Sequence, residues 1–167
     1  MKTLYIVRHA KSSWKYPELS DEERPLLEKG KKRTKKIIDY LHENSVKVDY
    51  IITSHAVRAH ETAKILAYAL KYPEEDIRVD HEIYFADSDK LFNQFYDLPD
   101  RYDHVMIVGH NPAFTNFANY FVSPKIDWLP TSGIVCIEFD TNRWDKIPTA
   151  NRRTSFVVYP KILTKSE

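Results

Sequence analysis

Short apolar runs alternate with longer amphipathic segments through most of this chain. Residues 4–7 and 104–108 are almost wholly apolar, and residues 48–54 form a similar run with polar residues among its apolar ones. Such runs are typical of strands that are covered on both faces of a parallel sheet. Residues 26–43 place apolar side chains at spacings of three, four and seven, which predicts an amphipathic helix. The alternation of strands and helices predicts an α/β fold.

The rest of the chain continues this pattern to about residue 121 and then changes to β structure. The prediction is a three-layer αβα sandwich with a mainly parallel central sheet and an antiparallel edge, in a single domain of residues 1–167. We expect a helix to about Leu70 and a second helix that runs to about Leu98, with Asp87, Ser88 or Asp89 as its N-cap. A third helix is expected over residues 113–121, with Asn111 as N-cap and Pro112 in its first turn. Further strands are expected at 77–79, 134–140 and 153–159, and a frayed tail at 160–167.

Composition narrows the choice of partners and compartment. The chain has 25 Lys and Arg against 24 Asp and Glu, so no overall field favours nucleic acid or a membrane as partner. No apolar run approaches the roughly 20 residues of a membrane span, and the first residues show no signal-peptide pattern. The one cysteine, Cys136, cannot form an internal disulfide and is interpreted as buried packing. We therefore expect a cytoplasmic protein.

Charged and titratable side chains follow three of the predicted strands at the point where each strand ends. Arg8 and His9 follow the first, Arg58 lies in the first turn of the helix after the second, and His110 follows the run at 104–108. Ligands of open α/β sheets bind beyond the carboxyl ends of the strands. Guanidinium groups and helix N-termini favour phosphoryl oxygens, and a neutral imidazole nitrogen can act as a nucleophile. If these strands are neighbours, the four side chains converge on one pocket; the alternative is that Arg8 and His9 merely end a strand.

Other kinds of site fit the sequence less well. The histidines show no His-Glu-x-x-His spacing and there is no Cys-x-x-Cys pair. Two arginines in one pocket would also repel a divalent cation, so we expect no metal and no cofactor. A serine hydrolase would need a Gly-x-Ser-x-Gly turn, which the chain lacks. With 3 glycines the chain has no glycine-rich phosphate loop, so a phosphate must be held mainly by side chains.

Taken together, these motifs resemble the histidine phosphatase superfamily, which shares the phosphoglycerate mutase-like fold. The short length and two further segments resemble its SixA-like phosphohistidine phosphatase branch. The resemblance covers residues 3–140. The residues that carry it are Arg8 and His9; Ser54, Arg58, Ala59, Thr62 and Ala63; Gly109, His110, Asn111 and Pro112; and, for the branch, Arg24, Pro25, Leu26 and Gly30 with Thr131, Ser132, Gly133 and Ile134.

The resemblance implies a role for each of the four side chains at the strand ends. His9 would attack phosphorus and become phosphorylated, Arg8 and Arg58 would hold phosphoryl oxygens, and His110 would donate to the same group. For one ring nitrogen of His9 to attack, the other ring nitrogen of His9 would need a fixed partner, and we expect this partner to be a backbone carbonyl. Two departures from the family pattern stand out. Ala10 replaces the usual glycine, and the segment around Glu82 does not match the segment that carries a catalytic acid in other members, so Glu82 is interpreted as a surface carboxylate.

Three functions remain open on this evidence. The first is a metal-independent phosphatase that acts on phosphohistidine or another phosphoramidate, with a phosphorylated substrate that can be a phosphohistidine-bearing protein. The second is a phosphomonoesterase for a small metabolite, which would need a general acid because an alkoxide is a poor leaving group. The third is a non-catalytic phosphate-binding domain. The lack of a convincing acid favours the first function.

Overall fold

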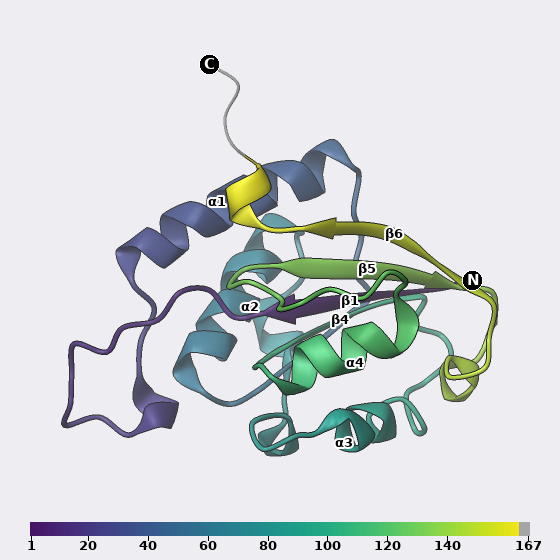
Figure 1. Ribbon diagram of the computed structural model, residues 1–167, viewed down its shortest axis with the longest axis horizontal. Helices are drawn as coiled ribbons and strands as arrows, with labels where there is room; N and C mark the ends of the chain where they lie inside the picture. Colours follow the sequence, from purple (N-terminus) through teal and green to yellow (C-terminus); the bar gives the residue numbers. More distant parts are fainter. Residues whose placement is uncertain (164–167) are drawn as a thin grey trace.

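The computed structural model describes residues 1–163, and within them six strands form one twisted sheet (Figure 1). The strand order is β3-β2-β4-β1-β5-β6. The first four strands in sequence run parallel to one another, and β5 and β6 are antiparallel to their neighbours. This confirms the predicted mainly parallel sheet with an antiparallel edge. The strands are β1 (Lys2–Arg8), β2 (Tyr50–Thr53), β3 (Arg78–Val79), β4 (His104–Gly109), β5 (Ile134–Phe139) and β6 (Arg152–Val158).

Helices cover both faces of the sheet, which makes the three layers that the sequence predicts. Alternate side chains of β1 enter two separate cores: Tyr5 and Val7 pack with α1 (Glu28–Glu43) and α2 (Val57–Ala69), and Leu4 and Ile6 pack on the side of α3 (Ser88–Asn93) and α4 (Ala113–Phe121). Both faces of the central strands are therefore buried, which explains their uniformly apolar sequences. Short 3₁₀ helices lie at η1 (Asp21–Glu23), η2 (Glu74–Asp76), η3 (His81–Ile83), η4 (Trp144–Lys146) and η5 (Pro160–Ile162).

Two helix predictions need correction. The helix expected to reach Leu98 ends at Asn93, because the following turns are closed by hydrogen bonds that span three residues, such as Phe95 N–H to the carbonyl of Phe92 at 3.0 Å. Its N-cap is Asp87, whose carboxylate accepts the N–H of Lys90 at 2.9 Å.

At α4, Pro112 rather than Asn111 occupies the N-cap position. Asn111 still caps the helix with its side chain, because its Oδ1 accepts the N–H of Thr115 at 3.0 Å.

The tail is more ordered than the sequence suggests. Residues 160–162 form η5, and Pro160 is buried, so the expectation of fraying is wrong there; residues 164–167 lie outside the described residues. Strand β6 is an antiparallel edge strand, as expected. Among residues 1–163, no helix is both long and apolar enough to cross a membrane.

Candidate active site

The sheet brings the predicted site residues together because β2, β4 and β1 are adjacent and parallel. Arg8 lies opposite Gly109 in the register, so His9 and His110 leave the sheet side by side at its carboxyl edge. Their ring centroids are 5.2 Å apart. Arg58, in the first turn of α2, completes the group, and all four side chains line one cavity of about 440 Å³.

His9 is held as a neutral imidazole with one nitrogen available for attack. The residue is only 6% exposed, and its Nδ1 is 2.7 Å from the carbonyl oxygen of Ala10. A carbonyl only accepts, so Nδ1 carries the proton and Nε2 keeps its lone pair. Burial is the main cause that lowers the pKa of His9, the Ala10 carbonyl opposes it, and the charges of Arg58 and Arg8 add to the lowering; the resulting pKa is about 3. Ala10 thus supplies the backbone partner that the sequence analysis expects but does not identify.

Each of the two arginines that line the cavity has a donor without an acceptor. Arg8 donates from Nη1 to the carbonyl of Leu129 at 3.2 Å, and Arg58 donates from Nη1 and Nη2 to Asp21. The Nε atoms of both arginines are buried and have no acceptor among the residues that the structure describes. Buried donors without an acceptor are costly. A bound anion would accept from both. Burial, and then the charge of Arg58, lowers the pKa of Arg8, as expected for two cations that lie close together.

His110 is oriented by Ser54. Its Nε2 lies 2.7 Å from the Ser54 hydroxyl, which also accepts the N–H of Ala56 at 3.2 Å. The hydroxyl hydrogen is then free to donate to Nε2, an arrangement that places the His110 proton on Nδ1; Nδ1 is buried without a partner among the described residues. Burial, followed by the proximity of His9 and Arg58, lowers the pKa of His110 to about 3. With its proton on Nδ1, neutral His110 has an N–H donor that a ligand can use.

The cavity holds a third guanidinium group that was not among the predicted site residues. Arg24 is 8% exposed and lines the same cavity, together with Lys11 and Trp14. Trp14 and Arg24 belong to a polar segment with no periodic pattern, which gives no local signal for a site. Arg24, Pro25 and Leu26 belong to the family motif, and this motif was the one feature of the sequence that could have marked Arg24 as a site residue. In contrast, Glu82 is exposed and does not line the cavity.

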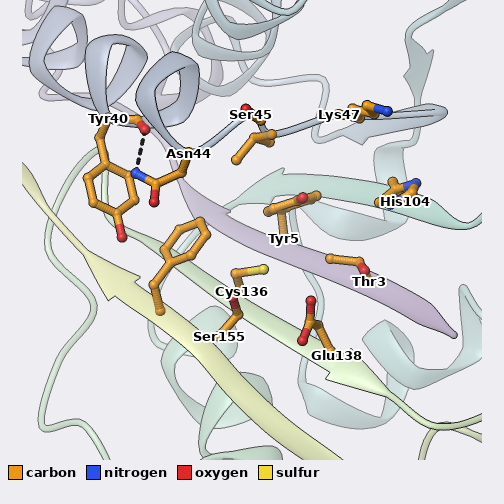
Figure 2. A pocket seen from close by; sticks show the side chains of 12 residues that line it. Thr3, Tyr5, Tyr40, Asn44, Ser45, Lys47, His104, Cys136, Glu138 and Ser155 are labelled. Carbon is orange, nitrogen blue, oxygen red and sulfur yellow. Dashed lines mark hydrogen bonds between the residues drawn. The ribbon is translucent and has the colours of Figure 1, made fainter.

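A second cavity, of about 390 Å³, lies at the opposite end of β1 (Figure 2). Its floor includes Tyr5 and Cys136, and none of the four predicted site residues reaches it. Burial raises the pKa of the Cys136 thiol to about 12, and the residue is 2% exposed, so the thiol is unreactive. Cys136 is buried packing, as predicted. Among the described residues, no group of three or more His, Cys, Asp or Glu side chains is placed to hold a metal ion.

Comparison with known proteins defines the class to which this fold and site belong. The model of the histidine phosphatase superfamily (branch 1) matches residues 4–105. The chain therefore belongs to the histidine phosphatase superfamily, and this membership implies phosphatase chemistry. The match contains His9, Arg8 and Arg58, and it ends before His110.

Individual relatives share limited sequence identity with this chain. A Picosynechococcus protein of uncharacterised function is 35% identical over 74 residues, which are 44% of this chain and 45% of that protein, so the match spans less than half of the relative. An uncharacterised chloroplastic protein of Arabidopsis thaliana is 26% identical over 154 residues, covering 87% of this chain and 70% of that protein.

Solved structures show the same fold. A SixA-type protein of Agrobacterium tumefaciens superposes with a TM-score of 0.80 at 24% identity, covering 95% of this chain and 98% of the other. The protein histidine phosphatase SixA in complex with tungstate gives a TM-score of 0.77 at 19% identity, with 97% and 99% covered. The fold is thus that of the SixA-like, phosphoglycerate mutase-like proteins, as the resemblance implies.

Proposed function

We propose that this chain is a metal-independent phosphatase that hydrolyses phosphohistidine or a related phosphoramidate through a phosphorylated His9. One observation carries the proposal: a neutral imidazole with a free Nε2 lies beside donors of Arg8, Arg58 and His110 that have no acceptor among the described residues. A nucleophile surrounded by donors for an anion is what phosphoryl transfer needs. Residues 8–131 supply the walls of this cavity, so we propose that the chain acts as one domain.

The reaction proceeds in two displacements. The Nε2 lone pair of His9 attacks phosphorus, the bond from phosphorus to the leaving nitrogen breaks, and that nitrogen keeps the electron pair and takes a proton from water. Arg8 and Arg58 neutralise the phosphoryl oxygens, and the Nδ1 proton of His110 donates to one of them. Water then attacks the phosphorus of phospho-His9, the P–Nε2 bond breaks, and its electron pair returns to Nε2 as phosphate leaves.

The carboxylates around the site support a phosphorus–nitrogen bond as the one that is cleaved. Expelling an alkoxide requires a placed acid, whereas an imidazole leaving group, with a free pKa near ~6.5, can be protonated from solvent. Asp21 is the carboxylate bonded to Arg58. Partial burial raises its pKa, but hydrogen bonds from Tyr84 and Arg58 prevail and lower it to about 2. Asp21 is therefore ionised at neutral pH and cannot donate a proton, and Glu82 lies off the cavity. The names of the SixA relatives point to the same class of substrate.

The substrate class is tested by comparing kcat/KM for phosphohistidine, a small phosphoramidate and several alkyl monoesters. We expect kcat/KM to be roughly tenfold or more higher for the phosphorus–nitrogen substrates, because their leaving group needs no acid. The phosphomonoesterase alternative would be established if an alkyl monoester had the higher kcat/KM by that factor and Glu82→Gln abolished its hydrolysis. Phosphate binding without any turnover would establish the non-catalytic alternative.

The covalent step is tested by brief reaction with labelled substrate. The label that stays on the protein is then located, and its stability in acid and in base is compared. We expect label on His9 and none in His9→Ala, with loss of nearly all turnover in that variant. Arg8→Ala should lower kcat on the order of 10²-fold, the usual effect of removing one preorganised charge-stabilising donor. A chelator should leave turnover intact; activity that disappears with chelator and returns with zinc would instead show a metal-dependent reaction.

A further inference from the structure

The loop of residues 14–25 is fastened across the site at both its base and its tip. At the base, Ser12 and Leu26 form an isolated antiparallel bridge, and Ser13 N–H donates to the carbonyl of Pro25 at 2.8 Å. At the tip, η1 lies against the start of α2 (Figure 1), where Glu22 meets His55 at 2.7 Å. The loop therefore has a defined position relative to the cavity.

Asp21, at the tip, joins groups from three different elements. Its Oδ2 accepts from Arg58 Nη2 at 2.9 Å and from the Tyr84 hydroxyl, and its Oδ1 accepts from Arg24 Nε at 3.0 Å. Its backbone carbonyl also accepts from Arg58 Nη1 at 2.7 Å. One carboxylate thus contacts two of the guanidinium groups that line the cavity.

These contacts occupy one edge of Arg58 and leave another edge free. Both terminal nitrogens of Arg58 donate to Asp21, whereas its buried Nε has no acceptor among the described residues. Because guanidinium is planar and rigid, fixing the terminal edge also fixes the direction of Nε. Asp21 itself does not line the cavity, so it holds Arg58 from behind and does not occupy the place of a substrate.

Arg24 is fixed in a similar way. Its Nε is bound by Asp21, its Nη1 donates to Ser12 Oγ at 3.0 Å, and its guanidinium lies 3.5 Å from the ring centroid of Trp14. Stacking on an indole does not use the in-plane donors of the guanidinium. Nη1 also donates to the carbonyl of Ser13 at 3.3 Å, so Nη2 is the nitrogen left for a ligand among the described contacts. A buried cation held this way beside His9 favours an additional anionic oxygen in the cavity.

We propose that Asp21 is a positioning residue that orients Arg58 and Arg24 toward the phosphoryl group, and that Arg24 is a further substrate-binding cation. This deepens the proposed function and rests on it. The loop of residues 14–25 then serves to deliver Asp21 and Arg24 to the site, since Asp21 reaches Arg58 only because the loop lies against α2. Its role is the alignment of the charges that stabilise transfer.

The proposal is tested with Asp21→Asn, which keeps the shape of the side chain and removes its charge. We expect kcat/KM on a small phosphoramidate to fall on the order of 10- to 100-fold, the usual range for outer-shell partners of a site, mainly through kcat. The inhibition constant of inorganic phosphate should rise as well. The matched control is Glu23→Gln in the same loop, where Glu23 caps η1 by accepting from Ser20 and touches no guanidinium of the cavity. It should leave both quantities within about twofold, as expected of an exposed surface change.

Arg24→Ala should weaken phosphate binding on its own, and Asp21→Asn should have less effect in that background than alone, because the two residues act as a unit. Higher activity or tighter phosphate binding in Asp21→Asn would overturn the proposal, since it would make Asp21 a competitor of the substrate. Equal losses in Asp21→Asn and Glu23→Gln would also overturn it, since loop order alone would explain them. If the parent protein turns over no phosphoramidate, the proposed function fails. Calorimetric titration with phosphate then still decides whether Asp21→Asn weakens the anion site.

Discussion

At the scale of single residues, the site contains two histidines that stay neutral because they are buried and lie among cations. Each ring has one nitrogen fixed by a neighbour: His9 by the Ala10 carbonyl and His110 by the Ser54 hydroxyl. Burial lowers the pKa of both to about 3, from an ordinary value of 6.5. Both rings are therefore neutral at neutral pH, as the proposed mechanism requires of its nucleophile and its donor, and the depressed pKa values have a consequence for the stability of the protein.

We expect the free energy of unfolding to fall as the pH drops below about 6.5. Between pH 6.5 and about 3 the unfolded chain binds protons on His9 and His110 that the folded chain does not, so acid favours unfolding. The limiting slope is about 1.4 kcal/mol per pH unit for each histidine, or roughly 2 kcal/mol each at pH 5. Urea unfolding at pH 7 and at pH 5 measures this loss.

The matched variant is His110→Gln, which should remove about half of the slope contributed by the pair. Equal stability at pH 7 and pH 5 in the parent protein would show that the two rings take up protons in the folded state as readily as in the unfolded chain.

The sequence identified His9, Arg8, Arg58 and His110 because each lies within a few residues of a strand end, where local pattern fixes position. Arg24 and Asp21 could not be placed in the same way. Asp21 lies 37 residues from Arg58 in the chain, and their contact depends on the path of a polar loop that has no periodic pattern. The family motif with Arg24, Pro25 and Leu26 marked the segment without showing what it contacts.

At the scale of elements, the first turn of α1 packs directly on the segment that follows His9. A Cβ atom at Gly30 would lie 2.4 Å from the carbonyl oxygen of Lys11 and 3.0 Å from its nitrogen. Both are backbone atoms, so the clash cannot be relieved by a side-chain rotation. The position needs glycine because two backbones approach closely there, which gives a physical reason for Gly30 in the family motif.

We expect Gly30→Ala to destabilise the protein, although the same change in an ordinary helix adds about 0.5–1 kcal/mol of stability. Forcing a methyl group into a closely packed contact costs on the order of 1–3 kcal/mol. Because Lys11 lines the cavity, kcat/KM should fall too. Urea unfolding measures the change in the free energy of unfolding, and steady-state kinetics measures the change in kcat/KM. Lys32→Ala, at an exposed position of the same helix, should stay within about 0.5 kcal/mol of the parent. A Gly30→Ala variant more stable than the parent would show that the two backbones can separate without cost.

The elements themselves were largely predictable. The uniformly apolar strands and the helix at residues 113–121 agree with the structure, because strand burial and helical spacing are local signals. The predictions failed where apolar spacing continued past a helix end. Phe95 and Leu98 are buried, as a longer α3 would suggest, but they reach the core from turns. Tertiary packing decided that boundary.

At the scale of the whole molecule, two exposed tryptophans flank the cavity on a chain whose net charge is only +1. Trp14 is 78% exposed and Trp128 is 53% exposed. Their rings lie against Arg24 and Arg8, with the Arg8 guanidinium 5.9 Å from the Trp128 ring centroid. Large exposed aromatic side chains beside a functional site are typical of protein contacts. Under the proposed function, we expect these rings to contact a polypeptide that carries the phosphoryl group.

We expect Trp14→Ala and Trp128→Ala each to raise KM for a phosphohistidine-bearing protein more than KM for a small phosphoramidate, because only the larger substrate reaches the rim. A contact that contributes about 1 kcal/mol or more, as interface tryptophans commonly do, corresponds to roughly a fivefold difference between the two ratios. The control is Tyr68→Ala on α2, an aromatic residue 89% exposed that does not line the cavity. It should change neither KM. Equal increases for both substrates would mean that the tryptophans act only by holding Arg24 and Arg8, and no increase for the protein substrate would mean that it docks elsewhere.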